Sequence, residues 1–233
     1  MDNLKKIVVL TGAGISAESG IKTFRDAGGL WEEHDITEVA TPQAWKKNPA
    51  LVTRFYNERR KQLFSVSPNA GHLALVTLEQ KYDVQIITQN VDDLHERAGS
   101  TKVLHLHGEL KKVRSTLDEK LIYTLTEENC EVKIGDKCEK GSQLRPHIVW
   151  FGEAVPNIGK AAQLTEKCDI LIVIGTSLNV YPAAGLLEYA PYHAPKYLID
   201  PNDSPAFGIK NLRKILAPAT VGVPQLVEEL MNT

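Results

Sequence analysis

The chain has 233 residues, 42% of them hydrophobic and 24% charged, which suits one globular domain, alone or with a small insert. Its 27 basic residues nearly balance 29 acidic ones, so the formal charge of −2 gives no support to nucleic-acid or membrane-surface binding. No apolar run approaches the roughly 20 residues of a membrane span, and the N-terminal segment does not resemble a signal peptide. Three cysteines do not build a disulfide framework, so we expect a cytoplasmic protein.

The stretch from Lys5 to Arg25, KKIVVLTGAGISAESGIKTFR, joins an apolar run to a glycine-rich turn and the start of a helix. Gly12 would permit a tight turn, Gly14 would let the backbone approach a phosphate, and Ala17 would let the helix pack on the strand. This pattern, G-x-G-x-x-[GA], predicts binding of an anionic diphosphate. A glycine turn without a nucleotide is the alternative, because the pattern alone is weak.

The region after the turn argues against an ordinary dehydrogenase. Such an enzyme needs a second strand that ends in an acidic residue about 20 residues further on. Here the sequence reads AGGLWEEHDITEVATPQAW, which has acidic residues but no strand before them. The turn therefore indicates a dinucleotide outside the usual dehydrogenase context.

Short apolar runs are expected to form buried strands at 7–10, 84–88, 103–106, 170–174 and 197–199. The fourth is apolar throughout and leads into Gly-Thr-Ser, as expected of a central parallel strand whose carboxyl end faces a ligand. Helical patterns at 70–79, 159–166 and 224–231 alternate with these runs. The alternation predicts an α/β fold with a doubly wound parallel sheet.

Two segments interrupt this alternation. Residues 26–65 read as helix and loop with no strand signal, and residues 109–145 are polar, charged and poor in pattern. We expect the two insertions to form a second, smaller module, with the binding site in the cleft between it and the sheet.

Polar residues follow the second predicted strand, in the order Thr88-Gln89-Asn90-Val91-Asp92-Asp93-Leu94. At the carboxyl end of a parallel strand, Gln89, Asn90 and Asp92 could bind ribose hydroxyls and a carboxamide. Alternatively, Asp92 or Asp93 caps a helix that starts at Leu94.

Two histidines, His105 and His107, share one face of the third predicted strand. His107 stands at the strand end before Gly108, a position suited to a general base. A structural role is the alternative. A His-x-His metal site has no supporting carboxylate or thiol pattern.

Five segments in this order resemble the sirtuin family of NAD-dependent protein-lysine deacylases: GAGISAESGIKTFR, TQNVDDLHERAG, LHGE, RPHIVWFGE and GTSLNVYPAAGL. The resemblance covers residues 5 to about 229. It implies a single catalytic domain, with a Rossmann-like large part at approximately 1–26, 66–108 and 146–233 and a small module at 27–65 and 109–145.

The resemblance also implies roles for individual residues. His107 would be the general base, and Asn90 would act with it in catalysis. The products would be nicotinamide, free lysine and O-acyl-ADP-ribose. NAD would be bound by Gly12, Ala13, Gly14, Ser16, Ala17, Phe24, Arg25, Gln89, Asn90, Asp92, Gly175, Thr176, Ser177, Asp200, Pro201, Asn202 and Ala219. Acyl-lysine-bearing proteins or peptides would be the partners, pairing as an added strand with Val149, Trp150, Phe151 and Gly152.

The segment NPALVTRFYNERRKQLF reads as a helix that starts at Pro49 and places Tyr56 and Arg59 on one face. Together with Ala40, these residues resemble the bacterial sirtuin branch that removes succinyl and malonyl groups. Arg59 would bind the distal carboxylate, Tyr56 would hydrogen-bond to it, and Ala40 would leave room. Acetyl-lysine would also be accepted. A solvated basic helix face is the alternative.

Most sirtuins carry a zinc ribbon with two Cys-x-x-Cys pairs, and this chain has neither pair. Cys130 and Cys138 could form a metal site only with carboxylates such as Asp118, Glu131 or Asp136, so we expect no metal. Cys168 is expected to be an inert core thiol. Rival functions are a sirtuin-like ADP-ribosyltransferase, an NAD hydrolase or a non-catalytic NAD-sensing module, although intact Asn90 and His107 argue against a sensor.

Overall fold

The fold was analysed in a computed structural model that describes residues 4–22, 30–31, 34–176, 181–203 and 209–233. Six parallel strands form the main sheet in the order β11-β10-β9-β1-β4-β5. Their bounds are Lys6–Thr11 (β1), Asp83–Thr88 (β4), Val103–His105 (β5), Ile170–Ile174 (β9), Lys196–Ile199 (β10) and Leu212–Ile215 (β11). Because β4 and β9 flank β1 on opposite sides, the sheet has its topological switch point beside β1, where doubly wound sheets bind ligands.

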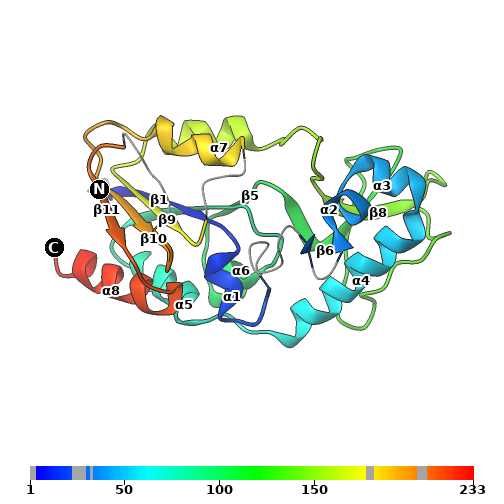
Figure 1. Cartoon of the computed structure of the whole chain (residues 1–233), viewed down its shortest axis with the longest axis horizontal. Coiled ribbons are helices and arrows are strands. Elements are labelled where there is room, and N and C mark those ends of the chain that lie inside the picture. Colours follow the sequence, from blue (N-terminus) through cyan, green and yellow to red (C-terminus); the bar gives the residue numbers. More distant parts are fainter. Residues whose placement is uncertain (1–3, 23–29, 32–33, 177–180, 204–208) are drawn as a thin grey trace.

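Helices cover both faces of this sheet (Figure 1). Ile7 and Val9 point to the face that packs against α5 (Ala70–Leu78) and α8 (Ala219–Met231). Val8 and Leu10 point to the face covered by α7 (Ile158–Thr165) and the 3-10 helix η1 (Ala183–Tyr189). Alternate side chains of β1 are therefore buried in two separate cores, which explains its continuous apolar sequence.

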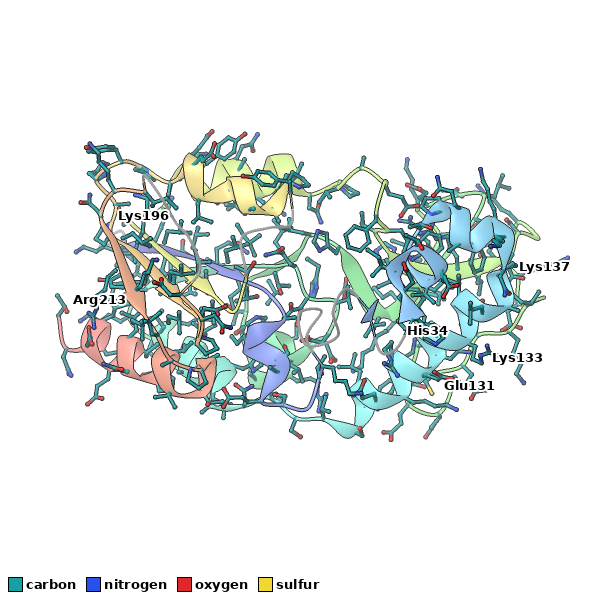
Figure 2. The ribbon with its side chains drawn as sticks, viewed as in Figure 1. His34, Glu131, Lys133, Lys137, Lys196 and Arg213 are labelled. Carbon is teal, nitrogen blue, oxygen red and sulfur yellow. The ribbon has the colours of Figure 1, made fainter. Side chains whose placement is uncertain are left out.

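A smaller module lies at the other end of the molecule (Figure 1). Its antiparallel sheet has the order β7-β6-β8. The helices α2, α3 and α4 pack near it around a third core that includes Phe55, Leu110 and Trp150. The bounds are Gly108–Ser115 (β6), Ile122–Thr124 (β7), Leu144–Ile148 (β8), Ile36–Val39 (α2), Pro42–Lys47 (α3) and Pro49–Ser65 (α4), with the short pair β2 (Leu30–Trp31) and β3 (His34–Asp35) beside them. Figure 2 shows the module residues Glu131 and Lys133 at the end opposite Lys196 and Arg213 of the main sheet.

The long helix α4 is fixed at its start and in its middle. The Asn48 side chain accepts a hydrogen bond from the Leu51 amide, and Pro49 occupies the first turn, a favourable start for a helix. Arg60 is only 1% exposed, and its guanidinium donates to the carbonyl oxygens of Leu110 at 2.7 Å and Cys130 at 2.6 Å. Arg60 thus ties α4 to β6 and to the loop that carries Cys130.

The structure confirms the predicted α/β fold class with a parallel sheet and a smaller module. The prediction of no strand in residues 26–65 is corrected, because β2 and β3 lie there. Residues 109–145, for which no pattern was found, contain β7 and most of β6. Strand β11 was not predicted, and α8 starts five residues earlier than expected, with Pro224 inside the helix. Among the described residues, no helix is long and apolar enough to cross a membrane.

Replacing Gly175 by alanine is expected to destabilise the fold by about 2 kcal/mol. Gly175 has a φ of +61°, and an added Cβ would lie 2.5 Å from the Ile15 nitrogen. Gly159→Ala is the matched control, since a Cβ there meets no atom within 4 Å and alanine favours the helix. Urea unfolding of both variants measures the difference, and equal stabilities would contradict this packing argument.

Candidate active site

The loops that follow β1, β4 and β9 leave the sheet at the same edge. The amide of Gly12 donates to Ile174 O at 3.0 Å, and the amide of Gln89 donates to Thr11 O at 2.9 Å. These bonds extend the strand ladder beyond the strands and fix where each loop begins. The predicted glycine turn and the predicted polar segment therefore lie together at the carboxyl edge of the sheet.

The glycine turn packs directly against the loop after β9. The amide of Gly14 donates to Gly175 O at 2.9 Å, and a Cβ on Gly14 would lie 2.5 Å from the Gly175 Cα. A Cβ on Gly12 would lie 2.7 Å from Gly175 O. The turn after β1 therefore needs glycine at both positions in order to pack against the loop after β9. The sequence analysis did not predict this contact. The following helix, α1 (Gly14–Ala17), has only four residues, so its dipole contributes less than a long helix would.

A buried hydrogen-bond network joins the glycine turn to the loop after β4. The Asn90 amide donates to Gly12 O at 3.1 Å and to Ser16 Oγ at 3.2 Å. Ser16 Oγ in turn donates to Asp92 Oδ2 at 2.9 Å. All three side chains are buried, and burial raises the pKa of the Asp92 carboxyl above its ordinary value despite these hydrogen bonds.

The Asp92 side chain also caps the start of the helix that follows. Its Oδ1 accepts from the Leu94 amide at 3.1 Å, at the start of α6 (Leu94–Ala98). The residue at the cap position itself, Asp93, makes no capping bond through its side chain. Asp92 therefore supports the helix start and binds Ser16 with its other oxygen.

His107 follows β5 and faces the same loop. Its Nδ1 lies 3.0 Å from Gln89 O, and because a carbonyl only accepts, Nδ1 carries the hydrogen. The other nitrogen, Nε2, is then the basic atom of a neutral ring. Burial lowers the pKa of His107 below its ordinary value, although the bond to Gln89 opposes this shift. This arrangement suits a general base.

His105 has a different environment from His107. Its Nδ1 lies 3.1 Å from Asn90 O and its Nε2 lies 2.8 Å from Glu96 Oε1. Both ring nitrogens of His105 are thus engaged by protein oxygens, and Nδ1 of His107 is engaged as well. This geometry gives no support to a His-x-His metal site.

Hydrogen bonds hold the turn where a sirtuin zinc ribbon would begin. Ser115 Oγ accepts from the Leu117 and Asp118 amides at 3.1 and 3.2 Å, and the Cys138 thiol donates to it at 3.2 Å. All three cysteines are free thiols. Burial raises the pKa of the Cys168 thiol to about 11. Within the described part of the chain, no group of three or more His, Cys, Asp or Glu residues is placed to bind a metal.

Two of the predicted acyl-binding residues, Ala40 and Tyr56, lie in the third core, and Arg59 lies against Phe55 of that core. Tyr56 is fully buried, Arg59 is half-buried, and Ala40 is 2% exposed. The Arg59 guanidinium carbon lies 5.4 Å from the Phe55 ring centroid, and burial lowers the pKa of Arg59. The helix is therefore not a uniformly solvated basic face, since only Arg54 and Lys61 among its basic residues are exposed.

Trp150 connects this group to the loop after β8. Its indole Nε1 donates to the Tyr56 hydroxyl at 3.0 Å. The Arg145 guanidinium carbon lies 3.4 Å from the Trp150 ring centroid, and both of its terminal nitrogens donate to Glu153, at 2.8 and 3.1 Å. Sequence analysis missed Arg145 and Glu153, although both stand in the RPHIVWFGE segment.

The segment predicted to pair with a peptide already uses three of its amides within the chain. The amides of Val149, Trp150 and Phe151 donate to His107 O, Glu153 Oε2 and Ala40 O at 2.9, 2.8 and 3.0 Å. Phe151 is 44% exposed and Gly152 is also exposed. Bonds from these amides fix the loop between the main sheet and α2.

The remaining predicted cofactor residues lie after β1, β4, β9 and β10 and at the start of α8. Gln89 Nε2 donates to Thr176 Oγ1 at 3.2 Å, which joins the loops after β4 and β9. Asp200 is buried and accepts from the Asn202 amide at 2.9 Å, while Pro201 and Asn202 are exposed. Ala13 and Ala17 are half-buried, and Ala219 is buried at the start of α8. Phe24, Arg25 and Ser177 lie outside the described residues.

Comparison with known proteins identifies the family. The model of the Sir2 family matches residues 12–182. An NAD-dependent protein deacylase of Bacteroides thetaiotaomicron is 55% identical over 231 residues, 98% of this chain and 99% of the relative. One from Helicobacter pylori is 55% identical over 229 residues, again 98% and 99% of the two chains.

Solved structures agree with this result. A Sir2 homologue mutant in complex with ADP-ribose has a TM-score of 0.90 at 40% identity, covering 99% of this chain and 93% of that one. A Sir2 homologue in complex with NAD has a TM-score of 0.87 at 40% identity, with 99% and 91% covered. This chain therefore belongs to the Sir2 family.

Proposed function

We propose that this NAD-dependent protein deacylase removes succinyl and malonyl groups from lysine and also accepts acetyl-lysine in proteins or peptides. The observation that carries the proposal is the neutral His107 ring, with its basic Nε2, beside the buried Asn90–Ser16–Asp92 network. The curated relatives named as deacylases and the relatives solved with NAD or ADP-ribose support it.

The side chains at the sheet edge fit NAD by their chemistry. Asn90 and Asp92 offer amide and carboxyl groups to a carboxamide and to ribose hydroxyls, and the Gln89–Thr176 pair lies on the adjoining side. When bound, NAD would supply a ribose that takes up the acyl group as nicotinamide leaves, and one water would be consumed in releasing free lysine and O-acyl-ADP-ribose. Burial of Asn90 and Asp92 keeps water from the carboxamide end of the site.

His107 would move a proton at its Nε2 atom. Its Nδ1 hydrogen is held by Gln89 O, so the ring cannot turn without losing that bond. The lowered pKa keeps the ring neutral at pH 7, ready to accept a proton from a ribose hydroxyl.

The acyl preference is argued from Tyr56 and Arg59. Because an indole N–H only donates, the Tyr56 oxygen must accept from Trp150, and its own proton is directed away from Trp150. Burial raises the pKa of Tyr56, so the hydroxyl stays neutral and acts as a donor. Arg59 adds a charged, planar donor that matches a carboxylate. The pair would recognise an acyl chain that ends in a carboxylate.

We also propose that the chain divides approximately at the boundaries given above, with a large part at 1–26, 66–108 and 146–233. Strand β8 crosses the last boundary, because it pairs with β6 of the small module. The site would lie between the large part and the small module at 27–65 and 109–145. The contacts of the Val149–Phe151 amides with His107 and Ala40 support this arrangement, because they tie the two parts together.

Replacing His107 by alanine is expected to lower NAD-dependent deacylation at least about 100-fold, because the general base is lost. NAD binding, measured by calorimetry, should persist. Exposed His193, changed to alanine, is the matched control. Release of nicotinamide from NAD in the presence of an acyl-lysine peptide provides the rate, and near-normal turnover of the His107 variant would eliminate it as the base.

Replacing Arg59 by methionine is expected to lower kcat/KM for a succinyl-lysine peptide about 10- to 100-fold, because a charge-assisted hydrogen bond is lost. The value for the matched acetyl-lysine peptide should change by less than about threefold. Arg54→Met, on the exposed side of the same helix, should leave both values unchanged. Equal losses with both peptides would remove Arg59 from the acyl pocket.

The acidic limb of kcat/KM against pH should lie below the ordinary histidine pKa of 6.5. Burial lowers the pKa of His107, so the ring is neutral above that lowered value and activity is lost only as the pH falls through it. Initial rates across the acidic range test this sign. An acidic limb above the ordinary value would show that another group controls the step.

A further inference from the structure

We propose that His105 is a positioning residue, which holds the loop after β4 in its active geometry as an imidazolium ion bound to both Glu96 and the Asn90 carbonyl. The proposal goes beyond the deacylase assignment, although its activity readout rests on that assignment. In this role His105 neither contacts substrate nor transfers a proton.

The charge state follows from the two hydrogen-bond partners. Asn90 O lies 3.1 Å from Nδ1 and Glu96 Oε1 lies 2.8 Å from Nε2, and both oxygens only accept. A neutral imidazole has a single N–H and can satisfy only one of them. Both bonds require two ring protons and hence a positive charge. The His105 side chain is 9% exposed, so water competes little for either nitrogen.

The loop position depends on this ion. His105 binds the carbonyl of Asn90, and His107 binds the preceding carbonyl, that of Gln89. The two rings therefore fix consecutive peptide groups of the loop that carries Asn90 and Asp92. If His105 loses one proton, one of its two bonds must break, and the charged Glu96 is the stronger acceptor. The Asn90 carbonyl is then released, and the Asn90 side chain loses part of its support.

The charges around His105 are consistent with the ion. Burial alone would lower the pKa of His105, but Glu96 and Glu109 raise it above the ordinary value. Burial alone would raise the pKa of Glu96, but His105 and Lys112 lower it. The other titratable neighbours are Asp92, whose pKa is raised by burial, and His95, whose pKa burial lowers well below its ordinary value.

His105 and His107 therefore limit activity at opposite ends of the pH range. His107 must be neutral, and burial lowers its pKa. His105 must be charged, and its raised pKa means that the ion is present at lower pH and lost as the pH rises through that value. The pH profile should have an acidic limb from His107 and an alkaline limb from His105.

The test is Glu96→Gln, with Glu166→Gln as the matched control that removes an exposed carboxylate at the end of α7. In the Glu96 variant, the alkaline limb should move about one pH unit lower, and the acidic limb should not move. NMR titration of the His105 ring should show the same downward shift. His105→Gln, which cannot titrate, should abolish the alkaline limb.

The NMR titration and the pH profile together decide whether His105 acts as a charged positioning residue. Matching shifts in the NMR titration and in the alkaline limb support it. A His105 ring whose pKa lies below the ordinary histidine value overturns it, and so does an alkaline limb that Glu96→Gln leaves in place. Absence of peptide-dependent nicotinamide release at every pH overturns the deacylase assignment, and the NMR titration of His105 then decides its charge independently. Activity with an unmoved alkaline limb overturns only the role of His105.

Discussion

The site depends on one buried polar network, formed by Ser16, Asn90 and Asp92. These side chains are at most 8% exposed, so any hydrogen bond that they lose cannot be replaced by water. Asn90 joins the glycine turn through Gly12 O, and Asp92 joins α6 through the Leu94 amide. The turn after β1 and the loop after β4 therefore behave as one unit, and the residues proposed to meet NAD are placed before any ligand arrives.

Two further sets of contacts extend this unit toward the small module. His107 is held at one end by Gln89 O, and its own carbonyl accepts from the Val149 amide. Beyond Val149, Trp150 lies between the Arg145 guanidinium and the Tyr56 hydroxyl, while Glu153 neutralises the arginine. The proposed base and the proposed acyl pocket are thus linked through Val149 and Trp150, two consecutive residues of one loop.

Strands were predicted most accurately from the sequence where apolar residues follow one another with little interruption. The strands β1 and β9 were found because both faces of the sheet are covered and the predicted runs are apolar throughout, and β4 was found although Gln85 interrupts its run. Strand β11 was missed because it lies at the sheet edge with Arg213 and Lys214 exposed. Strand β6 mixes buried Val113 with lysines, which hides its pattern. The start of α8 was misplaced because Pro224 normally marks a helix beginning, but here it lies inside the helix.

The site was predictable only in part, because the sequence shows residue types but not side-chain directions or contacts between distant elements. Residue types at strand ends indicate chemistry, so Asn90, Asp92 and His107 stood out. The sequence cannot say that Arg60 is buried while its neighbour Arg59 is half-buried, because both lie on one helix and differ only in the direction of the side chain. Nor can it show that Glu96 meets His105, since that contact requires α6 and β5 to be placed first.

Transfer of an acyl group from lysine to ADP-ribose, with a preference for acidic acyl groups, can be followed by mass spectrometry of matched succinyl-lysine and acetyl-lysine peptides incubated with the protein, with and without NAD. We expect NAD-dependent loss of succinyl, faster than loss of acetyl, together with O-succinyl-ADP-ribose. Nicotinamide release that is independent of peptide, with no O-acyl-ADP-ribose, would contradict it.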